Sequence, residues 1–277
     1  MTVIEAVISG IVQGLTEFLP VSSSGHLVIF YTLTGRGGDA NLAFSVLLHL
    51  ATLLSVVIMF FGDVRMLAQE LIAVFADIIK RRKHRKTPQR RLLLLLLAAT
   101  APAVLAGLGI KALGFDDILE NIFVVAVMLA VTSVLMFCVD RFKRGRHTAK
   151  NAPAKSALAV GLVQAAAILP GLSRSGSTIF AGLLVGFRKD FAVRFAFLMS
   201  IPVILGAGLV EAAGIVNSGG PVIAPASMAA GFLAAMVCGV FAIKFIKALI
   251  KSNKFYIFGI YCLLASAFAF LLGFGVV

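Results

Sequence analysis

Long apolar stretches alternate with short polar ones along the chain, and six of the apolar stretches are long enough to cross a bilayer. A membrane-spanning helix needs about 17–25 mostly apolar residues. Blocks such as Leu92–Leu97 are continuous and do not alternate with polar residues, so they predict helices and not the strands of a barrel. The six expected spans are 41–61, 92–112, 121–140, 190–215, 226–247 and 255–277.

Two further apolar stretches, 2–38 and 156–188, are interrupted near the middle by Pro, Gly and Ser. The runs on either side of each break are short for a crossing, so each stretch predicts a re-entrant helical hairpin with its break at membrane depth. Irregular backbone at that depth must be buried in protein or line a wet cavity. The stretch Val64–Ile79 is amphipathic and predicts a helix along the cytoplasmic interface.

Lys and Arg residues gather in three clusters between or beside the apolar stretches, at Lys80–Arg91, Arg141–Lys155 and Lys244–Lys254. Cytoplasmic loops of membrane proteins carry such an excess of positive charge. With these clusters in the cytoplasm, the first hairpin opens to the outside, the second opens to the inside, and the acidic turn Asp116–Asp117 lies outside. The same placement makes a nucleic-acid partner unexpected despite the net charge of +13.

Composition strengthens the membrane interpretation, because 60% of the 277 residues are hydrophobic and only 13% are charged. Soluble domains have about 45–50% apolar and about 25% charged residues. We therefore expect one integral membrane domain, 1–277. No Lys or Arg precedes the first apolar stretch, so a cleavable signal peptide is not expected. The three cysteines lie in apolar segments and are interpreted as small buried hydrophobes.

The two interrupted stretches are related in sequence. At an offset of 151, eleven of 38 ungapped positions are identical, against roughly three or four expected by chance. The halves 1–140 and 156–277, joined by a basic cytoplasmic loop 141–155, therefore predict an inverted-topology repeat whose two breaks meet near the midplane. The identities pair Gly10, Val12, Gln13, Ser22, Ser24, Gly25, Leu33, Gly35, Asp39, Phe44 and Leu47 with Gly161, Val163, Gln164, Ser173, Ser175, Gly176, Leu184, Gly186, Asp190, Phe195 and Leu198.

The differences between the two breaks suggest the chemistry. Where the first copy has Glu17, Ser23 and His26, the second has Ile168, Arg174 and Ser177. The two loops together thus offer a carboxylate, hydroxyls, an imidazole and a guanidinium. Gln13 and Glu17 are four residues apart and share one helix face.

Several features favour a phosphate or diphosphate ligand. Runs of Ser and Gly expose backbone N–H groups, and a following helix directs its positive end at an anion. An arginine within the membrane is costly and rarely lacks a functional partner, and its planar donor fork matches phosphate oxygens. The expected ligand-binding residues are Gln13, Ser22, Ser24, Gly25, Ser173, Ser175, Gly176 and Thr178.

The residues leave the reacting groups open. Ser22 or Ser23 is a candidate nucleophile with His26 as its base, and His26 is itself a candidate for attack on phosphorus. Glu17 is expected either to orient His26 or to hold a divalent cation. Outside the two loops, His49 is interpreted as a packing residue in a span. Glu211 is expected to be solvated at an outer end, while Arg188, Lys189 and Arg194 fit the cytoplasmic boundary, with Arg194 able to reach inward.

Two long motifs resemble those of a known family, the undecaprenyl-diphosphate phosphatases linked to bacitracin resistance. The first is Gln13-Gly-Leu-Thr-Glu-Phe-Leu-Pro-Val-Ser-Ser-Ser-Gly-His26, and the second is Pro170-Gly-Leu-Ser-Arg-Ser-Gly-Ser-Thr-Ile179. The motifs occur in the family's order, and the length and hydropathy of essentially the whole chain match as well.

The resemblance implies an enzyme of the bacterial inner (plasma) membrane that hydrolyses undecaprenyl diphosphate to undecaprenyl phosphate, the lipid carrier of cell-wall synthesis. It implies catalytic roles for Glu17, Ser23, His26 and Arg174, with Ser23 favoured as nucleophile and His26 as its base.

The resemblance also implies a divalent cation, Mg²⁺ or Ca²⁺, and a homodimer. Many members carry Glu where this chain has Gln13, so Glu17 is left as the main acidic metal ligand. The active site is expected to open to the outer (periplasmic) side. The main alternative function is a flippase for polyprenyl phosphate, with or without phosphatase activity.

Overall fold

The computed structural model describes residues 1–34, 39–81, 87–113, 121–142, 145–217 and 223–276. Within them the side chains of 34, 39–43, 111 and 211–217 are not described, so the expectations for Asp116–Asp117 and Glu211 lie outside the described residues. The regular structure of the described part is helical. The helices are α1 (Val3–Phe18), α2 (Ser23–Thr34), α3 (Asp39–Met59), α4 (Phe61–Ile79), α5 (Pro88–Leu113), α7 (Ile122–Val139), α8 (Ala154–Ala166), α9 (Arg174–Leu184), α10 (Lys189–Asn217), α11 (Pro225–Leu249) and α12 (Tyr256–Gly273).

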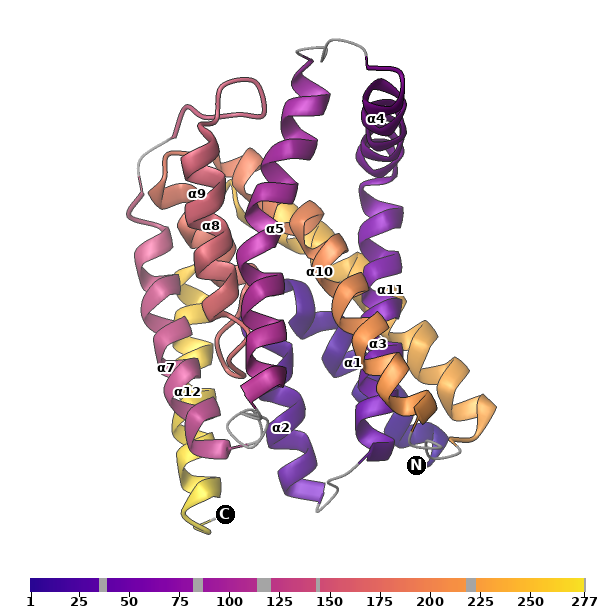
Figure 1. Ribbon diagram of the computed structural model, residues 1–277. Coiled ribbons are helices and arrows are strands. Elements are labelled where there is room, and N and C mark those ends of the chain that lie inside the picture. Colours follow the sequence, from indigo (N-terminus) through magenta and orange to yellow (C-terminus); the bar gives the residue numbers. More distant parts are fainter. Residues whose placement is uncertain (35–38, 82–86, 114–120, 143–144, 218–222, 277) are drawn as a thin grey trace.

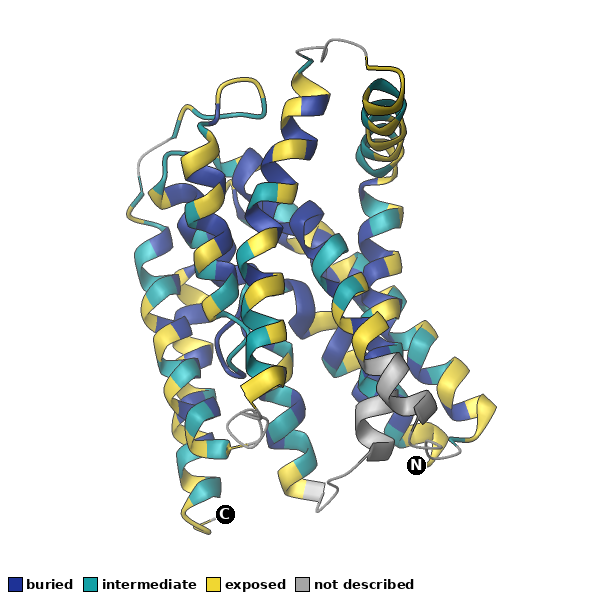
Figure 2. Cartoon of the chain, in the orientation of Figure 1, coloured by how far each residue is buried: buried dark blue, intermediate teal, exposed yellow. Residues whose placement is uncertain are grey.

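Each of the six predicted spans corresponds to one helix. Among the described residues α5, α7, α10, α11 and α12 are individually long and apolar enough to cross a membrane, and α3 qualifies together with α4. Many positions along these helices are exposed (Figure 2). They include large apolar side chains, such as Leu105, Leu209 and Leu264 with exposed fractions of 71%, 72% and 65%. Such surfaces are stable only when lipid covers them. The prediction of an all-α polytopic membrane protein is confirmed.

Helix α4 is not aligned with the helices of the bundle. It makes an angle of 94° with α3 across a single residue, Phe60, and it is seen end-on at the top of Figure 1. None of its residues is buried. The bend between α3 and α4 occurs where the amphipathic stretch begins. A helix with one polar face can leave the apolar core and keep that face in contact with water. The separate amphipathic helix is therefore observed, and its position along the cytoplasmic interface remains a prediction.

The two interrupted stretches form the two helix pairs α1–α2 and α8–α9. Their helices begin at Val3 and Ser23 in the first copy and at Ala154 and Arg174 in the second, so each pair of starts is 151 residues apart. In Figure 1 the first pair lies in the lower half of the bundle and the second in the upper half, with both breaks near the middle. This arrangement brings the two polar loops to the same depth from opposite ends.

Helices of one half of the chain pack mainly on helices of the other half. Helix α1 packs on α11, and its counterpart α8 packs on α5; α3 packs on α11, and its counterpart α10 packs on α5. The remaining major contacts join counterparts directly, α3 with α10 and α7 with α12. Two copies of one unit related by a twofold axis would pack in this way. The inverted orientation of the halves 1–140 and 156–277 in the membrane remains a prediction.

Glycines at equivalent positions allow this close packing. A side-chain carbon on Gly10 would overlap the carbonyl oxygen of Gly231 in α11, and one on Gly161 would overlap the carbonyl oxygen of Ala99 in α5. Small residues let the backbones of membrane helices approach closely. The identity of these two positions in the sequence repeat thus has a physical cause, since both helices contact a neighbouring backbone at the same point.

We expect Gly10→Ala and Gly161→Ala each to lower the free energy of unfolding by about 1–3 kcal/mol, the usual cost of overpacking. Thermal unfolding of the purified protein in detergent measures the effect. Gly107→Ala is the control, because no described residue lies within 4 Å of a side-chain carbon built at Gly107. Equal midpoints for all three variants and the wild type would contradict the packing described above.

Candidate active site

The first break is built around Ser22. Helix α1 ends at Phe18 just before Pro20, and the residue before a proline is disfavoured in the α conformation. Ser22 then adopts φ +71°, a left-handed backbone that costs an L-residue roughly 1–2 kcal/mol. Two hydrogen bonds offset that cost, because the Ser22 hydroxyl accepts the N–H of Gly25 at 3.3 Å and the N–H of Gly171 at 3.1 Å.

The second break repeats the same cap. Ser173 is the N-cap of α9, and its hydroxyl accepts the N–H of Gly176 at 3.1 Å. Gly171 supplies the turn here with φ +91°, where glycine carries no side-chain penalty. Thr132 of α7 holds this loop in place, since its hydroxyl donates to the carbonyl of Gly171 at 2.9 Å and accepts the N–H of Ser173 at 3.0 Å.

The two loops touch each other in a symmetric manner. A side-chain carbon on Gly25 would lie 3.0 Å from the α-carbon of Gly171, and one on Gly176 would lie 3.0 Å from the β-carbon of Pro20. Gly25 is the repeat counterpart of Gly176, and Pro20 is that of Gly171. The N-termini of α2 and α9 therefore meet, and each helix end carries partial positive charge and free N–H groups.

Glu17 is the centre of the polar cluster between the loops. One carboxylate oxygen pairs with the Arg174 guanidinium. The other accepts the hydroxyl of Ser23 at 2.6 Å and the side-chain amide of Gln13 at 2.9 Å. Glu17, Ser23 and Gln13 come from the first copy of the repeat and Arg174 from the second. The sequence-predicted sharing of one helix face by Gln13 and Glu17 is confirmed by their hydrogen bond.

The Glu17 and Arg174 side chains differ in how far they are exposed. The Glu17 side chain is 3% exposed, and that of Arg174 is 20% exposed. A buried carboxylate requires a charged partner and hydrogen bonds, and Glu17 has both. Arg174 can therefore be reached by an incoming anion while Glu17 remains covered. A phosphate that binds Arg174 would at the same time come close to the Ser23 hydroxyl.

His26 has partners other than Ser23. Its Nδ1 lies 2.7 Å from the carbonyl oxygen of Ser22, and its Nε2 lies 2.7 Å from the hydroxyl of Tyr261 in α12. A carbonyl can only accept, so Nδ1 carries the proton and Nε2 of the neutral ring accepts from Tyr261. The two rings are stacked at 5.5 Å with an interplanar angle of 6°. Among the described residues no hydrogen bond joins His26 to Ser23 or to Glu17.

The remaining predicted ligand residues hold the loops together in this structure. The hydroxyls of Ser22 and Ser24 are 3.4 Å apart. Ser175 donates to the carbonyl of Leu19 at 3.1 Å, which ties the second loop to the first. Thr178 donates to the carbonyl of Arg174 at 2.8 Å and is buried. These side chains shape the loops, so the backbone N–H groups of the first residues of α2 and α9 are the better candidates for contact with a ligand.

Sequence reasoning did not place two residues, His49 and Tyr261, beside the site. His49, interpreted as a packing residue, has its Nε2 3.8 Å from the Glu17 carboxylate, while its Nδ1 lies 2.8 Å from the carbonyl of Ser45. Tyr261 was not singled out at all, because a tyrosine in an apolar helix carries no signal of its distant partner. Arg194 does not reach the loops; its guanidinium binds Asp63 through bonds of 2.8 and 2.6 Å.

One side-chain oxygen of the Glu17 cluster, that of Gln13, is available to a hydrogen-bond donor or a cation. The side-chain oxygen of Gln13 is buried and has no hydrogen-bond partner in the described part of the chain, although the side-chain nitrogen of Gln13 is bound to Glu17. Among the described residues no group of three or more His, Cys, Asp or Glu side chains could hold a metal ion. A cation at this place would therefore need oxygen atoms from a bound phosphate or diphosphate in addition to those of Glu17 and Gln13.

Comparison with known proteins adds a consistent result. The family model described as "Bacitracin resistance protein BacA" matches residues 6–268. The undecaprenyl-diphosphatase of Alkaliphilus metalliredigens is 39% identical over 262 residues, which covers 94% of this chain and 95% of that protein. The undecaprenyl-diphosphatase of Methanobrevibacter smithii is 39% identical over 276 residues, with 98% of both chains covered. That of Methanosphaera stadtmanae is 36% identical over 273 residues, with 95% of both covered.

Proposed function

The chain belongs to the bacitracin resistance protein BacA family, and from this premise we propose that it hydrolyses undecaprenyl diphosphate to undecaprenyl phosphate and inorganic phosphate. Relatives that are 36–39% identical over nearly their full length carry the name undecaprenyl-diphosphatase. The single structural observation that supports the proposal most strongly is the Glu17 cluster, where a serine hydroxyl and an arginine meet on one buried carboxylate.

Arg174 is proposed to bind the terminal phosphate. In the ligand-free arrangement it neutralises Glu17. An arriving diphosphate offers more negative charge and a matching geometry for the guanidinium. When Arg174 turns to the phosphate, it leaves one Glu17 oxygen free for the divalent cation proposed below, while the other oxygen keeps its hydrogen bond to Ser23. The movement of one side chain thus positions the phosphate and leaves Glu17 able to accept the Ser23 proton.

Ser23 is proposed as the nucleophile. Its oxygen would attack the terminal phosphorus, and its proton would pass to Glu17 along the existing 2.6 Å hydrogen bond. The bond from phosphorus to the bridging oxygen breaks, and undecaprenyl phosphate leaves with that oxygen and its electron pair. Water then cleaves the phosphoserine, giving inorganic phosphate and free Ser23. The N-termini of α2 and α9 would stabilise the charge that develops on the transferred phosphoryl group.

His26 is proposed to activate the water of the second step through the Tyr261 hydroxyl, which donates to Nε2 and can take a proton from the water. Tyr261→Phe removes that donor and keeps the ring. One neutral hydrogen bond is worth about 0.5–1.5 kcal/mol, so we expect kcat to fall by about 2- to 10-fold. The neutral imidazole loses its donor, so the acidic limb of the pH profile of kcat, which includes the second step, should move to higher pH. An unchanged profile would exclude this role for Tyr261.

A divalent cation, Mg²⁺ or Ca²⁺, is proposed to bind together with the diphosphate. Such ions take oxygen ligands, and Mg²⁺ often combines one or two carboxylates with substrate phosphates. Glu17 and the unpartnered oxygen of Gln13 would supply the protein ligands, and the ion would neutralise phosphate charge. Chelation with EDTA should therefore abolish turnover, and added Mg²⁺ or Ca²⁺ should restore it. Full activity in excess EDTA would contradict the proposal.

The hypothesis of a polyprenyl-phosphate flippase predicts a different result in one assay. Purified protein in detergent has no second compartment, so a transporter without phosphatase activity would release no phosphate from undecaprenyl diphosphate. We expect release that depends on a divalent cation. Transport needs phosphate-binding groups such as Arg174 but needs no nucleophile. The close contact of Ser23 with a carboxylate therefore favours the enzyme.

The enzyme is proposed to lie in the bacterial inner (plasma) membrane as a homodimer, with its site open to the periplasm. The three basic clusters support the orientation through the positive-inside rule. Helices α1 and α2 enter the bundle from the end opposite α8 and α9 (Figure 1), so the first hairpin would open outward. Reporter fusions after the first and second hairpins test the orientation, and light scattering in detergent tests the dimer. The dimer rests on the family resemblance alone.

A further inference from the structure

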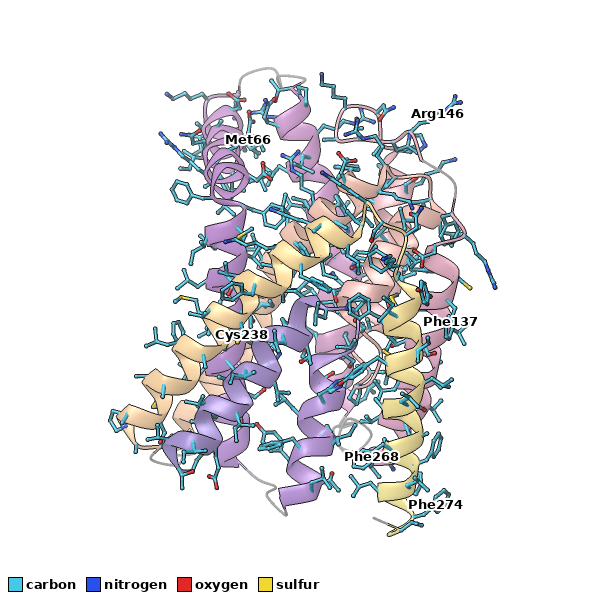
Figure 3. All side chains as sticks on the ribbon, turned by 180° about the vertical axis from the view of Figure 1, so that it is seen from behind. Met66, Phe137, Arg146, Cys238, Phe268 and Phe274 are labelled. Carbon is cyan, nitrogen blue, oxygen red and sulfur yellow. The ribbon has the colours of Figure 1, made fainter. Side chains whose placement is uncertain are left out.

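A cavity lies away from the Glu17 cluster, at the end of the bundle where α3 and α11 end and α10 begins. Its volume is about 1270 Å³, and it shares no lining residue with the site described above. Figure 3 shows nitrogen-bearing side chains gathered toward this end of the molecule, where Met66 and Arg146 are labelled. We name it the basic cavity, and its polar lining consists of Asp63, Arg188, Lys189, Asp190, Arg194, Lys247, Lys251 and Asn253.

The basic cavity carries excess positive charge. Five of its lining side chains are Lys or Arg and two are carboxylates, so three positive charges are not balanced within the lining. Arg194 is bound to Asp63 and Arg188 to Asp190. The three lysines therefore supply the unbalanced charge. An anion that enters the cavity would gain favourable interactions without first breaking either arginine pair.

Lys247 has an unusual setting for a cation. Its ammonium lies 3.7 Å from the centre of the Phe60 ring and 3.3 Å from the carbonyl oxygen of Met59, the last residue of α3. A ring face and a helix C-terminus both attract a cation. Neither neutralises it as a carboxylate would. The side chain is thus held in a fixed place with its charge still available.

The rest of the lining is apolar and continues outward. Met59, Phe60, Val193 and Ile250 line the inner part of the cavity, and Phe61 lines it with 61% of its surface exposed. Phe61 is the first residue of α4, the helix that leaves the bundle at 94°. A soluble anion would gain nothing from these apolar walls. A lipid would, because its headgroup and its acyl chains could both be accommodated.

We propose that the basic cavity binds the phosphate headgroup of an anionic phospholipid of the surrounding bilayer, with Lys247, Lys251 and Lys189 around the phosphate and the acyl chains along Phe61. Basic cavities between membrane helices are suited to such headgroups. This binding is independent of the proposed phosphatase reaction, because no residue is shared with the Glu17 cluster.

The chain contains no tryptophan, so one introduced tryptophan is a specific reporter. Phe61→Trp places it in the basic cavity. Phe274→Trp places the control at the far end of α12, where Phe274 is 71% exposed (Figure 3). Each variant is reconstituted in phosphatidylcholine vesicles that contain a small fraction of either brominated phosphatidylglycerol or brominated phosphatidylcholine. We expect brominated phosphatidylglycerol to quench the Phe61→Trp fluorescence at least twice as strongly as brominated phosphatidylcholine, and to show no such preference at Phe274→Trp.

Substitutions in the Phe61→Trp protein identify the charges involved. Lys247→Gln with Lys251→Gln should abolish the preference. Lys155→Gln should retain it, since Lys155 is an exposed basic residue outside the lining. Equal quenching by both lipids, or a preference that survives loss of both lysines, would overturn the proposal. Loss of the preference on addition of 10 mM inorganic phosphate would overturn it as well, because the cavity would then take soluble phosphate. Loss of phosphatase activity has no bearing on any of these outcomes.

Discussion

Arg174→Ala is expected to lower kcat/KM for undecaprenyl diphosphate by about 10²–10³-fold, the usual loss when one group that stabilises transition-state charge is removed. The guanidinium is the group of the cluster that an incoming phosphate can reach, with a side chain 20% exposed against 3% for Glu17. Arg174→Lys keeps a charge and loses the planar fork, so it should recover only part of the activity. Phosphate release by the purified variants in detergent measures both effects.

Stability must be separated from catalysis in this experiment. Breaking a buried ion pair from one side costs about 3–5 kcal/mol, because the other charge is left unpaired. The double variant Glu17→Gln, Arg174→Gln removes both charges, so it should regain much of the lost thermal stability and remain inactive. Arg194→Ala is the matched control, since Arg194 lies near the start of the next helix, α10, and binds Asp63 instead. If Arg174→Ala folds normally and keeps full activity, the second loop does not bind the phosphate.

Ser23→Ala is expected to lower turnover by about 10⁴-fold or more, as loss of a nucleophile does when no other group can replace it. Ser23 is at the start of α2, and its hydroxyl donates to Glu17 at 2.6 Å. Thr32→Ala is the control on the same helix, because the Thr32 hydroxyl donates to the carbonyl of Val28 within α2 and lies outside the Glu17 cluster. Thr32→Ala should keep wild-type turnover.

The nature of a trapped intermediate distinguishes Ser23 from His26 as nucleophile. Rapid quenching of the reaction with substrate labelled in the terminal phosphate should give acid-stable phosphoserine in the wild type and none in Ser23→Ala. An acid-labile phosphohistidine that persists in Ser23→Ala would assign the attack to His26. It would also leave the Ser23–Glu17 hydrogen bond with a purely structural role.

The sequence was sufficient for most of the fold, because hydropathy and repetition are local properties. All six expected spans are helices whose ends lie within a few residues of the prediction, for example Lys189–Asn217 for 190–215. The offset of 151 also located both breaks, since Pro20 and Gly171 interrupt helices at equivalent positions. A repeated pattern of small and polar residues at membrane depth must be buried against protein or line a wet cavity, and two such breaks at the same depth made contact between the loops predictable.

The partners of individual side chains were less predictable. Closeness in sequence suggested His26 as the partner of Ser23, but the left-handed backbone at Ser22 lets the His26 ring bond back to that residue's carbonyl and turn toward Tyr261, 235 residues away. The Ser23 hydroxyl instead lies beside Glu17, one helix earlier. Backbone angles of a single residue decide these contacts, and no hydropathy pattern records them.

The central claim is that the two related loops form one phosphate site, with the reacting groups on the first loop and the arginine on the second. An experimental structure with a non-hydrolysable methylene analogue of a polyprenyl diphosphate tests it most directly. We predict the terminal phosphonate within hydrogen-bonding distance of the Arg174 guanidinium, with the Ser23 oxygen facing its phosphorus and the N–H groups of α2 and α9 around its oxygens. An analogue bound with its phosphonates in the basic cavity, or touching only one of the two loops, would contradict the account.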